Sequence, residues 1–426
     1  MTTTSAPELA VQLGKLNAAQ NAYASQFVSE LLAAACQQGA SDVHLHPTAS
    51  GLEVRWRIDG VLQSVGTFPP GEAADVVSRL KVLSGLLTYR TDVPQEGRLE
   101  EEKVGRSSAP SHDKAGGVGF QAAQKIEMRV STFPTLYGER AVVRIFAAEG
   151  RFLFPEELGL PEEVHTGLLR KLDETSGALL ITGPAGSGKT TTAYAALRHL
   201  ARKVAGSKSL VSLEDPIEVA IPGVAQSQVN VAAGFDLAAG LRSLMRQDPE
   251  VILVGEIRDR PAAETAFQAA LTGHLVLTTF HASNCTSALS RLADMGIEPY
   301  LLRSGIRGVL SQRLVRKLCA CAEPIKREEQ KLGLPVASGK IAGKCEACAG
   351  TGYSGRLVLA ELLPPLEGEL ATAVLARRDS QQLFSTAVSV GLIPLFTRAC
   401  QAVEAGLTDP TEIRRVLGFE MPGNGS

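Results

Sequence analysis

The stretch ALLITGPAGSGKTTTAYAALRHL, residues 178–200, decides the fold of the second half of this 426-residue chain. It opens with the apolar run ALLIT, which is typical of a buried strand, and closes with TTAYAALRHL, which is typical of a helix. Between them, Gly183 to Thr190 match the pattern G-x-x-x-x-G-K-[ST] in full. Glycines at these positions let backbone N–H groups curl around a phosphate, and the following helix presents its positive end.

The match predicts a nucleotide site that takes ATP and Mg²⁺. Lys189 would place its charge at the β- and γ-phosphates, and Thr190 would offer its hydroxyl to the magnesium ion. The residues predicted to bind the nucleotide are Gly183, Pro184, Ala185, Gly186, Ser187, Gly188, Lys189, Thr190 and Thr191.

Three further apolar runs follow, at 209–213, 251–254 and 274–279, with helical segments between them. This alternation predicts an α/β domain with a mostly parallel sheet covered on both faces.

Carboxylates follow two of the runs, and the ends of parallel strands face one ligand crevice. Gly255 stands where a magnesium-binding Asp is expected, so Glu256 is the candidate, acting through water. The cluster of Glu214, Asp215 and Glu218 can orient an attacking water, or can simply be a strand-ending turn.

The first half has a different pattern, that of an α+β domain. A helical period starts at Tyr23 and has a plausible stop at Gly39, and Asp59-Gly60 predicts a tight hairpin between alternating strands. The predicted organisation is a flexible tail at 1–22, an α+β domain at 23–148 with a surface loop at 103–125, a linker at 149–160, and a second domain at 161–426 with a helical tail at 366–426.

Composition limits the classes of function. The 43 basic and 45 acidic residues give a formal net charge of −2, so the chain has no overall electrostatic footprint for nucleic acid or anionic membrane. It has no run of 18 apolar residues, and its first twenty residues lack the pattern of a signal peptide. The sequence therefore predicts a cytoplasmic protein without a membrane span.

Four of the seven cysteines have the spacing of a metal site. Cys319-x-Cys321 is followed, after 23 residues, by Cys345-x-x-Cys348. Four thiolates satisfy tetrahedral Zn²⁺, and short spacings bring each pair from one turn. The first pair is tighter than the usual C-x-x-C, so reduced, unligated thiols stay an alternative. The isolated Cys36, Cys285 and Cys400 are expected to be small core or half-buried side chains.

Several separate blocks together resemble one family. They are SDVHLHP (41–47), RWRIDGVL (55–62), PQEGRL (94–99), RVSTFPTLYGERAVVRI (129–145), EDPIE (214–218), LRSLMRQDPEVILVGEIRD (241–259), TGHLVLTTFHASN (272–284) and CEACAGTGYSGR (345–356). With the phosphate loop, they resemble the type II secretion and type IV pilus assembly ATPases, a branch of the hexameric RecA-like motors. The resemblance implies an N-terminal α+β, PAS-like domain and a C-terminal RecA-like P-loop ATPase domain with a tetracysteine metal-binding insertion at 319–348.

The resemblance also implies roles for individual residues. Glu214 matches the glutamate that activates water, and Glu256 matches the magnesium-associated Walker B residue. The residues that match the family's γ-phosphate-sensing histidine box and its nucleotide-reaching arginines are His274, His281, Arg129, Arg140 and Arg144, with Arg57 and Arg98 as further candidates. Ordinary alternatives remain open: a histidine in an apolar strand can be a satisfied core residue, and some of the arginines can form surface ion pairs.

By resemblance, the chain is expected to hydrolyse ATP as a cytoplasmic motor that powers assembly of a type II secretion pseudopilus or a type IV pilus. It would form a homohexameric ring and act at the inner membrane through a platform or docking protein, with no direct nucleic acid partner. Only residues 1–22 precede the first matching helix, so the family's usual extra N-terminal domain is expected to be absent. The alternatives are a pilus retraction motor, a DNA-uptake or DNA-translocating ATPase of related fold, and a non-hydrolysing nucleotide-binding scaffold.

Overall fold

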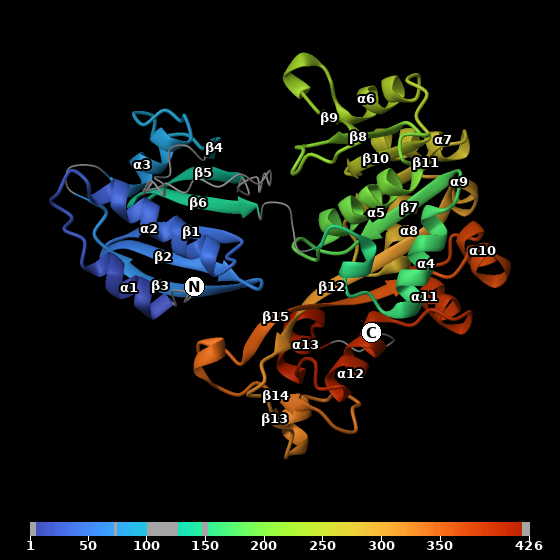
Figure 1. Cartoon of the computed structure of the whole chain (residues 1–426). Helices are drawn as coiled ribbons and strands as arrows, with labels where there is room; N and C mark the ends of the chain where they lie inside the picture. Colours follow the sequence, from blue (N-terminus) through green and yellow to red (C-terminus); the bar gives the residue numbers. More distant parts are fainter. Residues whose placement is uncertain (1–5, 72–74, 100–126, 147–151, 420–426) are drawn as a thin grey trace, which may run out of the picture. The chain divides into compact units, whose positions relative to one another are not determined.

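The computed structural model describes residues 6–71, 75–99, 127–146 and 152–419 of the chain (Figure 1). It divides the chain into two compact units, Met1–Gly150 and Arg151–Ser426. The predicted surface loop at 103–125 lies outside the described residues. In the predicted linker, Phe154 packs on the C-terminal unit: the guanidinium carbon of Arg202 lies 4.1 Å from the centroid of its ring.

The N-terminal unit is a six-stranded antiparallel sheet with helices packed on one face. The strand order is β3-β2-β1-β6-β5-β4. The elements are α1 (Ala6–Gly14), α2 (Tyr23–Gln37), β1 (Asp42–Thr48), β2 (Gly51–Ile58), β3 (Val61–Phe68), α3 (Val76–Leu83), β4 (Gln95–Leu99), β5 (Glu127–Thr135) and β6 (Gly138–Phe146). Alternate strand residues such as Val43 and Trp56 are buried with Phe27 of α2 in one core. Their neighbours His44 and Arg55 lie on the opposite face, where a pocket of about 420 Å³ opens.

The hairpin and helix predictions for this unit are confirmed, with two corrections. Asp59 and Gly60 both have positive φ, as the tight turn requires, and α2 ends just before Gly39. The apolar pattern at 76–87 is typical of an amphipathic helix, and the helix found there, α3, ends earlier, at Leu83. The prediction of a flexible tail was wrong for residues 6–14, which form α1. Leu9 and Leu13 lie four residues apart on one helix face and are buried in the core, which stabilises this short helix.

The C-terminal unit is built on a seven-stranded sheet of order β15-β12-β7-β11-β10-β8-β9, parallel except for the pairing of β12 with β15. The strands are β7 (Gly177–Thr182), β8 (Leu210–Glu214), β9 (Ala225–Gln228), β10 (Val251–Glu256), β11 (Leu275–Phe280), β12 (Ile306–Leu318) and β15 (Tyr353–Leu362). The helices are α4 (Glu162–Leu172), α5 (Lys189–Val204), α6 (Leu237–Leu244), α7 (Arg260–Leu271), α8 (Cys285–Asp294), α9 (Pro299–Gly305), α10 (Gly368–Leu375), α11 (Ser380–Ser389), α12 (Leu395–Glu404) and α13 (Pro410–Leu417).

Helices cover both faces of this sheet, as the sequence predicts. Along β7, Ala178 and Leu180 join a core that includes α7 and α8, whereas Leu179 and Ile181 join a second core with α4 and α5. Because β7 is central and buried on both sides, its apolar run is continuous rather than alternating. The phosphate-binding loop follows the carboxyl end of this strand.

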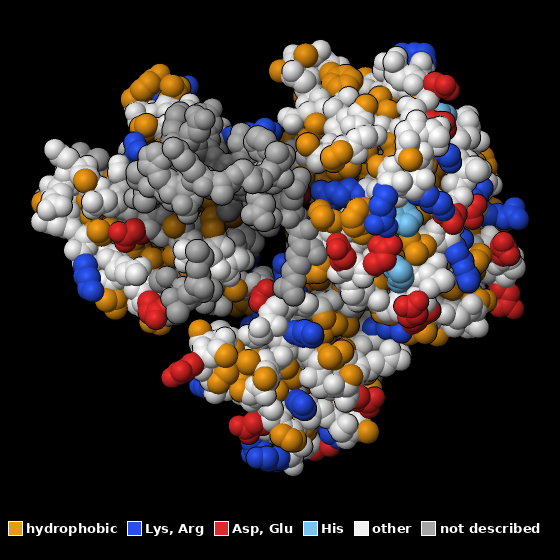
Figure 2. All heavy atoms as spheres, in the orientation of Figure 1, with side chains coloured by type: hydrophobic (Ala, Val, Ile, Leu, Met, Phe, Trp, Pro, Cys, Tyr) orange, Lys and Arg blue, Asp and Glu red, His pale blue; other side chains and the backbone are white. Residues whose placement is uncertain are grey.

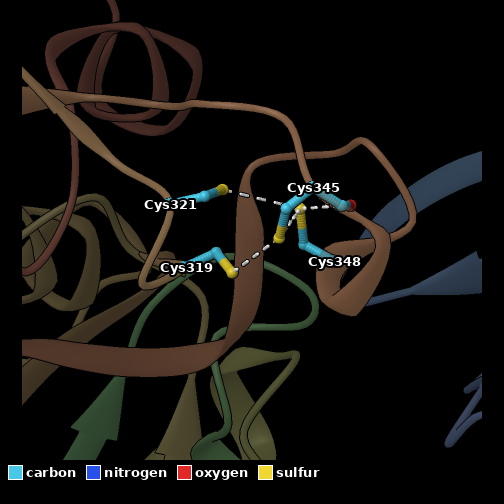
Figure 3. A group of neighbouring side chains, drawn as sticks. All are labelled: Cys319, Cys321, Cys345 and Cys348. Atoms are coloured by element: carbon cyan, nitrogen blue, oxygen red, sulfur yellow. Dashed lines mark hydrogen bonds between the residues drawn. The ribbon is translucent and has the colours of Figure 1, made fainter.

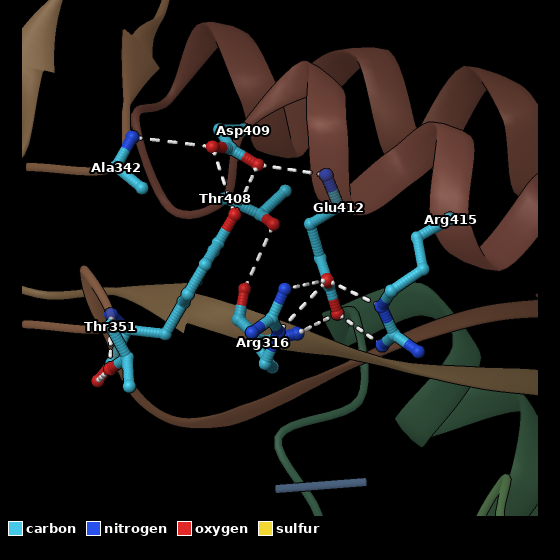
Figure 4. Close-up of polar contacts among 8 residues, drawn as sticks. Arg316, Ala342, Thr351, Thr408, Asp409, Glu412 and Arg415 are labelled. Carbon is cyan, nitrogen blue, oxygen red and sulfur yellow. Dashed lines mark hydrogen bonds and ion pairs between the residues drawn. The ribbon is translucent and has the colours of Figure 1, made fainter. Parts of the chain in front are cut away.

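A buried carboxylate ties the C-terminal helices to the sheet (Figure 4). Glu412 of α13 accepts hydrogen bonds from the backbone and guanidinium of Arg316 on β12 and from the Arg415 guanidinium. Burial alone would raise the pKa of Glu412, but the two arginines outweigh it and lower the pKa to about 2. The pKa is lower in the folded chain, so this contribution to stability is present above pH ~4.3 and is lost as the pH falls toward 2.

Candidate active site

The phosphate-binding loop has the cradle shape that the sequence predicts. Gly183 has φ +152°, and a Cβ there would lie 2.6 Å from the backbone oxygen of Gln312, so the position requires glycine. Gly186 and Gly188 also have positive φ, and α5 begins at Lys189 directly after them. The N-terminus of a long helix and the turned loop backbone together fit a bound phosphate. The half-buried hydroxyl residue Thr190 lies in the first turn, where it fits a magnesium ligand.

Lys189, His281 and Glu256 converge at the carboxyl edge of the sheet. The Lys189 ammonium is buried and donates to the carbonyls of Gly183 and Pro184, both at 3.0 Å, with Nδ1 of His281 at 3.5 Å. The other ring nitrogen of His281, Nε2, lies 2.7 Å from a Glu256 oxygen. Burial lowers the pKa of Lys189, while the Glu256 charge opposes that change. The arrangement places one cation and one carboxylate beside the phosphate cradle, bridged by an imidazole.

A bulge at Gly255 explains why glycine stands where an aspartate was expected. The register of β10 against β11 shifts between Val254 and Glu256, and the Thr279 hydroxyl donates to the Gly255 carbonyl at 2.6 Å. A Cβ on Gly255 would lie 3.2 Å from the Cα of Glu214. A larger residue would therefore crowd the neighbouring strand end, and the acidic side chain comes one position later.

Glu214 ends β8, the strand beside β10, and is only 3% exposed. Its carboxylate accepts hydrogen bonds from the hydroxyls of Tyr194 and Ser212 and from the side-chain amide of Gln226. The adjacent Asp215 is exposed and pairs with Arg258 instead. Glu214 thus lies at the carboxyl end of its strand, as predicted, with its carboxylate held by three hydrogen-bond donors, and its catalytic role stays a prediction.

Three of the residues that organise this site were not found from the sequence. Gln312 of β12 donates to the Ser187 carbonyl at 2.7 Å and accepts from the Thr192 hydroxyl at 3.0 Å. It therefore connects the phosphate loop and the first turn of α5 to β12. Arg258 bridges Glu256 and Asp215. Tyr194 is the third, through Glu214. Arg258 and Tyr194 stand close to recognised motifs, but Gln312 is over a hundred residues from the loop, and only strand order brings it there.

His274 is not brought to this cluster. It precedes the amino end of β11, whereas His281 follows the carboxyl end, so the two lie about 20 Å apart along the strand. A ring nitrogen of His274 contacts the Ala269 carbonyl at 2.9 Å. The family resemblance pairs the two histidines, because a sequence block does not show at which edge of the sheet each residue lies.

The predicted arginines all belong to the N-terminal unit. The Arg129 guanidinium carbon lies 5.0 Å from the Phe146 ring centroid, Arg140 lies 3.3 Å from Nδ1 of His44, and Arg144 donates to Asp42 at 3.1 Å. Arg140 also lines the 420 Å³ pocket on the open sheet face. Arg57 lies 3.6 Å from Asp42, and Arg98 is on β4. A contact of any of these arginines with nucleotide stays a prediction.

The four predicted cysteine ligands cluster in the C-terminal unit (Figure 3). All four sulfurs lie within 4.8 Å of one another, with 3.7 Å between Cys319 and Cys345 and 3.8 Å between Cys321 and Cys348. Sulfurs about 2.3 Å from a tetrahedral zinc ion are about 3.8 Å apart, so these thiols fit zinc. The Gly352 N–H donates to the Cys348 sulfur at 3.2 Å, which would support a thiolate. The C-x-C spacing does not prevent the cluster, because its two sulfurs face different partners.

The remaining cysteines lie as expected. Cys285 is fully buried with its sulfur 3.1 Å from the Val309 carbonyl, and Cys36 and Cys400 are half-buried.

The purified chain is expected to carry about one zinc per chain, and Cys345→Ser to carry far less, because three thiolates hold zinc more weakly than four. Elemental analysis and thiol titration measure both quantities. Cys400→Ser is the matched control, since Cys400 is outside the cluster, and it should keep its metal. A wild-type chain with well under one zinc would refute the assignment.

Comparisons with known proteins give one consistent result. The family model described as "Type II/IV secretion system protein" matches residues 17–109 and 113–415. The type IV pilus assembly ATPase PilB of Thermus thermophilus is 36% identical over 399 residues, which are 92% of this chain and 42% of that protein. The type II secretion system protein HxcR of Pseudomonas aeruginosa is 38% identical over 391 residues, which are 92% of this chain and 76% of that protein.

Solved structures share the fold at lower identity. The Legionella pneumophila ATPase DotB aligns with a TM-score of 0.63 at 18% identity, covering 92% of this chain and 95% of that one. The ADP-bound pilus retraction motor PilT aligns with a TM-score of 0.54 at 24% identity, covering 91% and 99%. These likenesses confirm the predicted ATPase fold class.

Proposed function

This chain belongs to the type II/IV secretion system protein family, and from that premise we propose that it is an ATP-hydrolysing motor that powers assembly of a type II secretion pseudopilus or a type IV pilus. The observation that carries the proposal is the convergence of Lys189, His281 and Glu256 beside a complete phosphate cradle. The relatives named for pilus assembly and type II secretion are 36% and 38% identical to the chain.

Within this proposal each side chain has a defined task. Lys189 and the loop backbone would hold the β- and γ-phosphates. Thr190, and Glu256 through water, would hold a magnesium ion, which would offset phosphate charge. Glu214 accepts a proton from the attacking water. His281 lies between Lys189 and Glu256, so its ring would sense a γ-phosphate bound beside Lys189. Arg129, Arg140 and Arg144 are the proposed sources of positive charge from the N-terminal unit.

The proposed working form is a homohexameric ring in the cytoplasm that docks on an inner-membrane platform protein. Among the residues that the structure describes, no helix is both long and apolar enough to cross a bilayer. On the face of the C-terminal unit visible in Figure 2, basic and acidic side chains are interspersed and form no broad basic surface.

Deletion of the chain in its own cells tests the function and separates its alternatives. An assembly motor predicts that pilin-like subunits no longer form fibres or that secretion stops, and that wild-type chain restores them while the Lys189→Ala chain does not. Fibres that accumulate in the deletion strain would indicate a retraction motor instead. Normal fibres with a loss of DNA uptake would indicate a DNA-handling ATPase.

A further inference from the structure

In the arrangement described, the candidate base Glu214 is only 3% exposed, and its carboxylate already accepts three hydrogen bonds. Its side chain is buried at the end of β8, and one carboxylate oxygen, Oε2, accepts the Tyr194 hydroxyl. The other oxygen accepts Ser212 Oγ at 2.5 Å and Gln226 Nε2 at 3.0 Å. A general base must accept a proton from water within hydrogen-bond reach. The carboxylate must therefore leave this environment, or the environment must open, before hydrolysis.

The three side chains that donate to the Glu214 carboxylate come from different elements, and their positions decide which hydrogen bond must break. Ser212 precedes Glu214 by two residues on the same strand, so it moves with the carboxylate. Tyr194 is on α5, the helix that begins at Lys189 of the phosphate loop. Its hydroxyl also accepts the backbone N–H of Glu218 at 3.1 Å, so one oxygen joins the nucleotide-binding helix to both the candidate base and the loop that follows it.

The Tyr194 hydroxyl is well suited to this role. Its side chain is buried, and burial followed by the Glu214 hydrogen bond raises the pKa of the phenol well above its ordinary value. It therefore stays a neutral donor through the physiological range. Gln226 of β9 is a weaker second tie, because an amide N–H is a less acidic hydrogen-bond donor than a phenol; its other amide hydrogen is donated to the Val219 carbonyl at 3.1 Å.

We propose that Tyr194 latches Glu214 in a withdrawn resting position, and that breaking the bond between the Tyr194 hydroxyl and the Glu214 carboxylate is a step that ATP turnover requires. This inference rests on the proposed function, in which Glu214 activates water. Movement of α5 relative to the end of β8 would open the latch, so occupancy of the phosphate loop is linked to availability of the base.

The test is steady-state ATP turnover of the purified full chain carrying Tyr194→Phe. The variant keeps the ring and loses only the latch, so kcat should rise roughly tenfold, the order expected for loss of a hydrogen bond to a charged group. KM for ATP should change little, because the phosphate loop is untouched. Gln226→Met removes the other donor from a separate element and should raise kcat in the same direction by a smaller factor.

Tyr353→Phe is the matched control. Its hydroxyl also contacts a buried carboxylate, that of Asp409 at 2.9 Å. Asp409 caps α13, outside the candidate active site, so ATP turnover should stay at the wild-type value. An equal rise in this control would mean general loosening and would overturn the latch. An unchanged or lower kcat in a Tyr194→Phe variant of wild-type thermal stability would also overturn the latch. If Tyr194→Phe does not fold, an unchanged or lower kcat in Gln226→Met would overturn it.

A double variant separates this inference from the function it rests on. If the extra rate runs through the base, Tyr194→Phe combined with Glu214→Gln should be as slow as Glu214→Gln alone. Fast turnover by Glu214→Gln alone would refute the role of Glu214. A slow Glu214→Gln variant beside an unaccelerated Tyr194→Phe variant would leave that role intact and refute only the latch.

Discussion

Replacing Lys189 with alanine is expected to lower the rate of ATP turnover by a factor of roughly 100 or more. The Lys189 ammonium lies inside the phosphate cradle, where it donates to the Gly183 and Pro184 carbonyls. Its burial strengthens every charge interaction that it makes there. Phosphate release from ATP and binding of a fluorescent ATP analogue measure both consequences, and both should be lost together.

Lys203→Ala is the appropriate control for that experiment. Lys203 is on the same helix, α5, but in its last turn and half-exposed, so its loss should leave turnover intact. Wild-type turnover in the Lys189→Ala chain would remove the phosphate-loop assignment, and with it the proposed function.

Glu214→Gln is expected to bind ATP with wild-type affinity and to hydrolyse it about 100- to 1,000-fold more slowly. Glutamine has the same shape as glutamate and can keep part of the hydrogen-bond environment, so the fold should be preserved. The amide cannot take a proton from water, so only the chemical step is affected. Single-turnover hydrolysis compared with equilibrium ATP binding separates these two effects.

The neighbouring carboxylate provides the comparison that makes this result specific. Asp215 follows directly in the chain but points to an exposed ion pair with Arg258, 3.2 Å away. Asp215→Asn should therefore slow hydrolysis far less than Glu214→Gln. The reverse order would transfer the role of the base to Asp215 and would also remove the basis for the Tyr194 latch.

The gain from the tertiary structure is clearest at residues that have no local signal. Gln312 can be identified as a support of the phosphate loop only when β12 is known to lie beside β7. His274 and His281 look equivalent in the sequence, and only the direction of β11 shows that they are at opposite edges. The sequence pattern does not predict the helix at residues 6–14, because its stability comes from burying Leu9 and Leu13 and the flanking residues are polar.

The sequence by itself determined the fold class, the phosphate loop, the two acidic strand ends and the four clustered cysteines. Each of these depends on short spacings, and hydrophobic period, glycine conformation and ligand geometry act over a few neighbouring residues. Only the tertiary structure decided which side chains meet. Strand order and helix packing bring Tyr194, Ser212 and Gln226 onto one carboxylate and Gln312 onto one loop. Such contacts depend on the whole sheet being formed, because burial and hydrogen bonding join residues by position in space and not by distance along the chain.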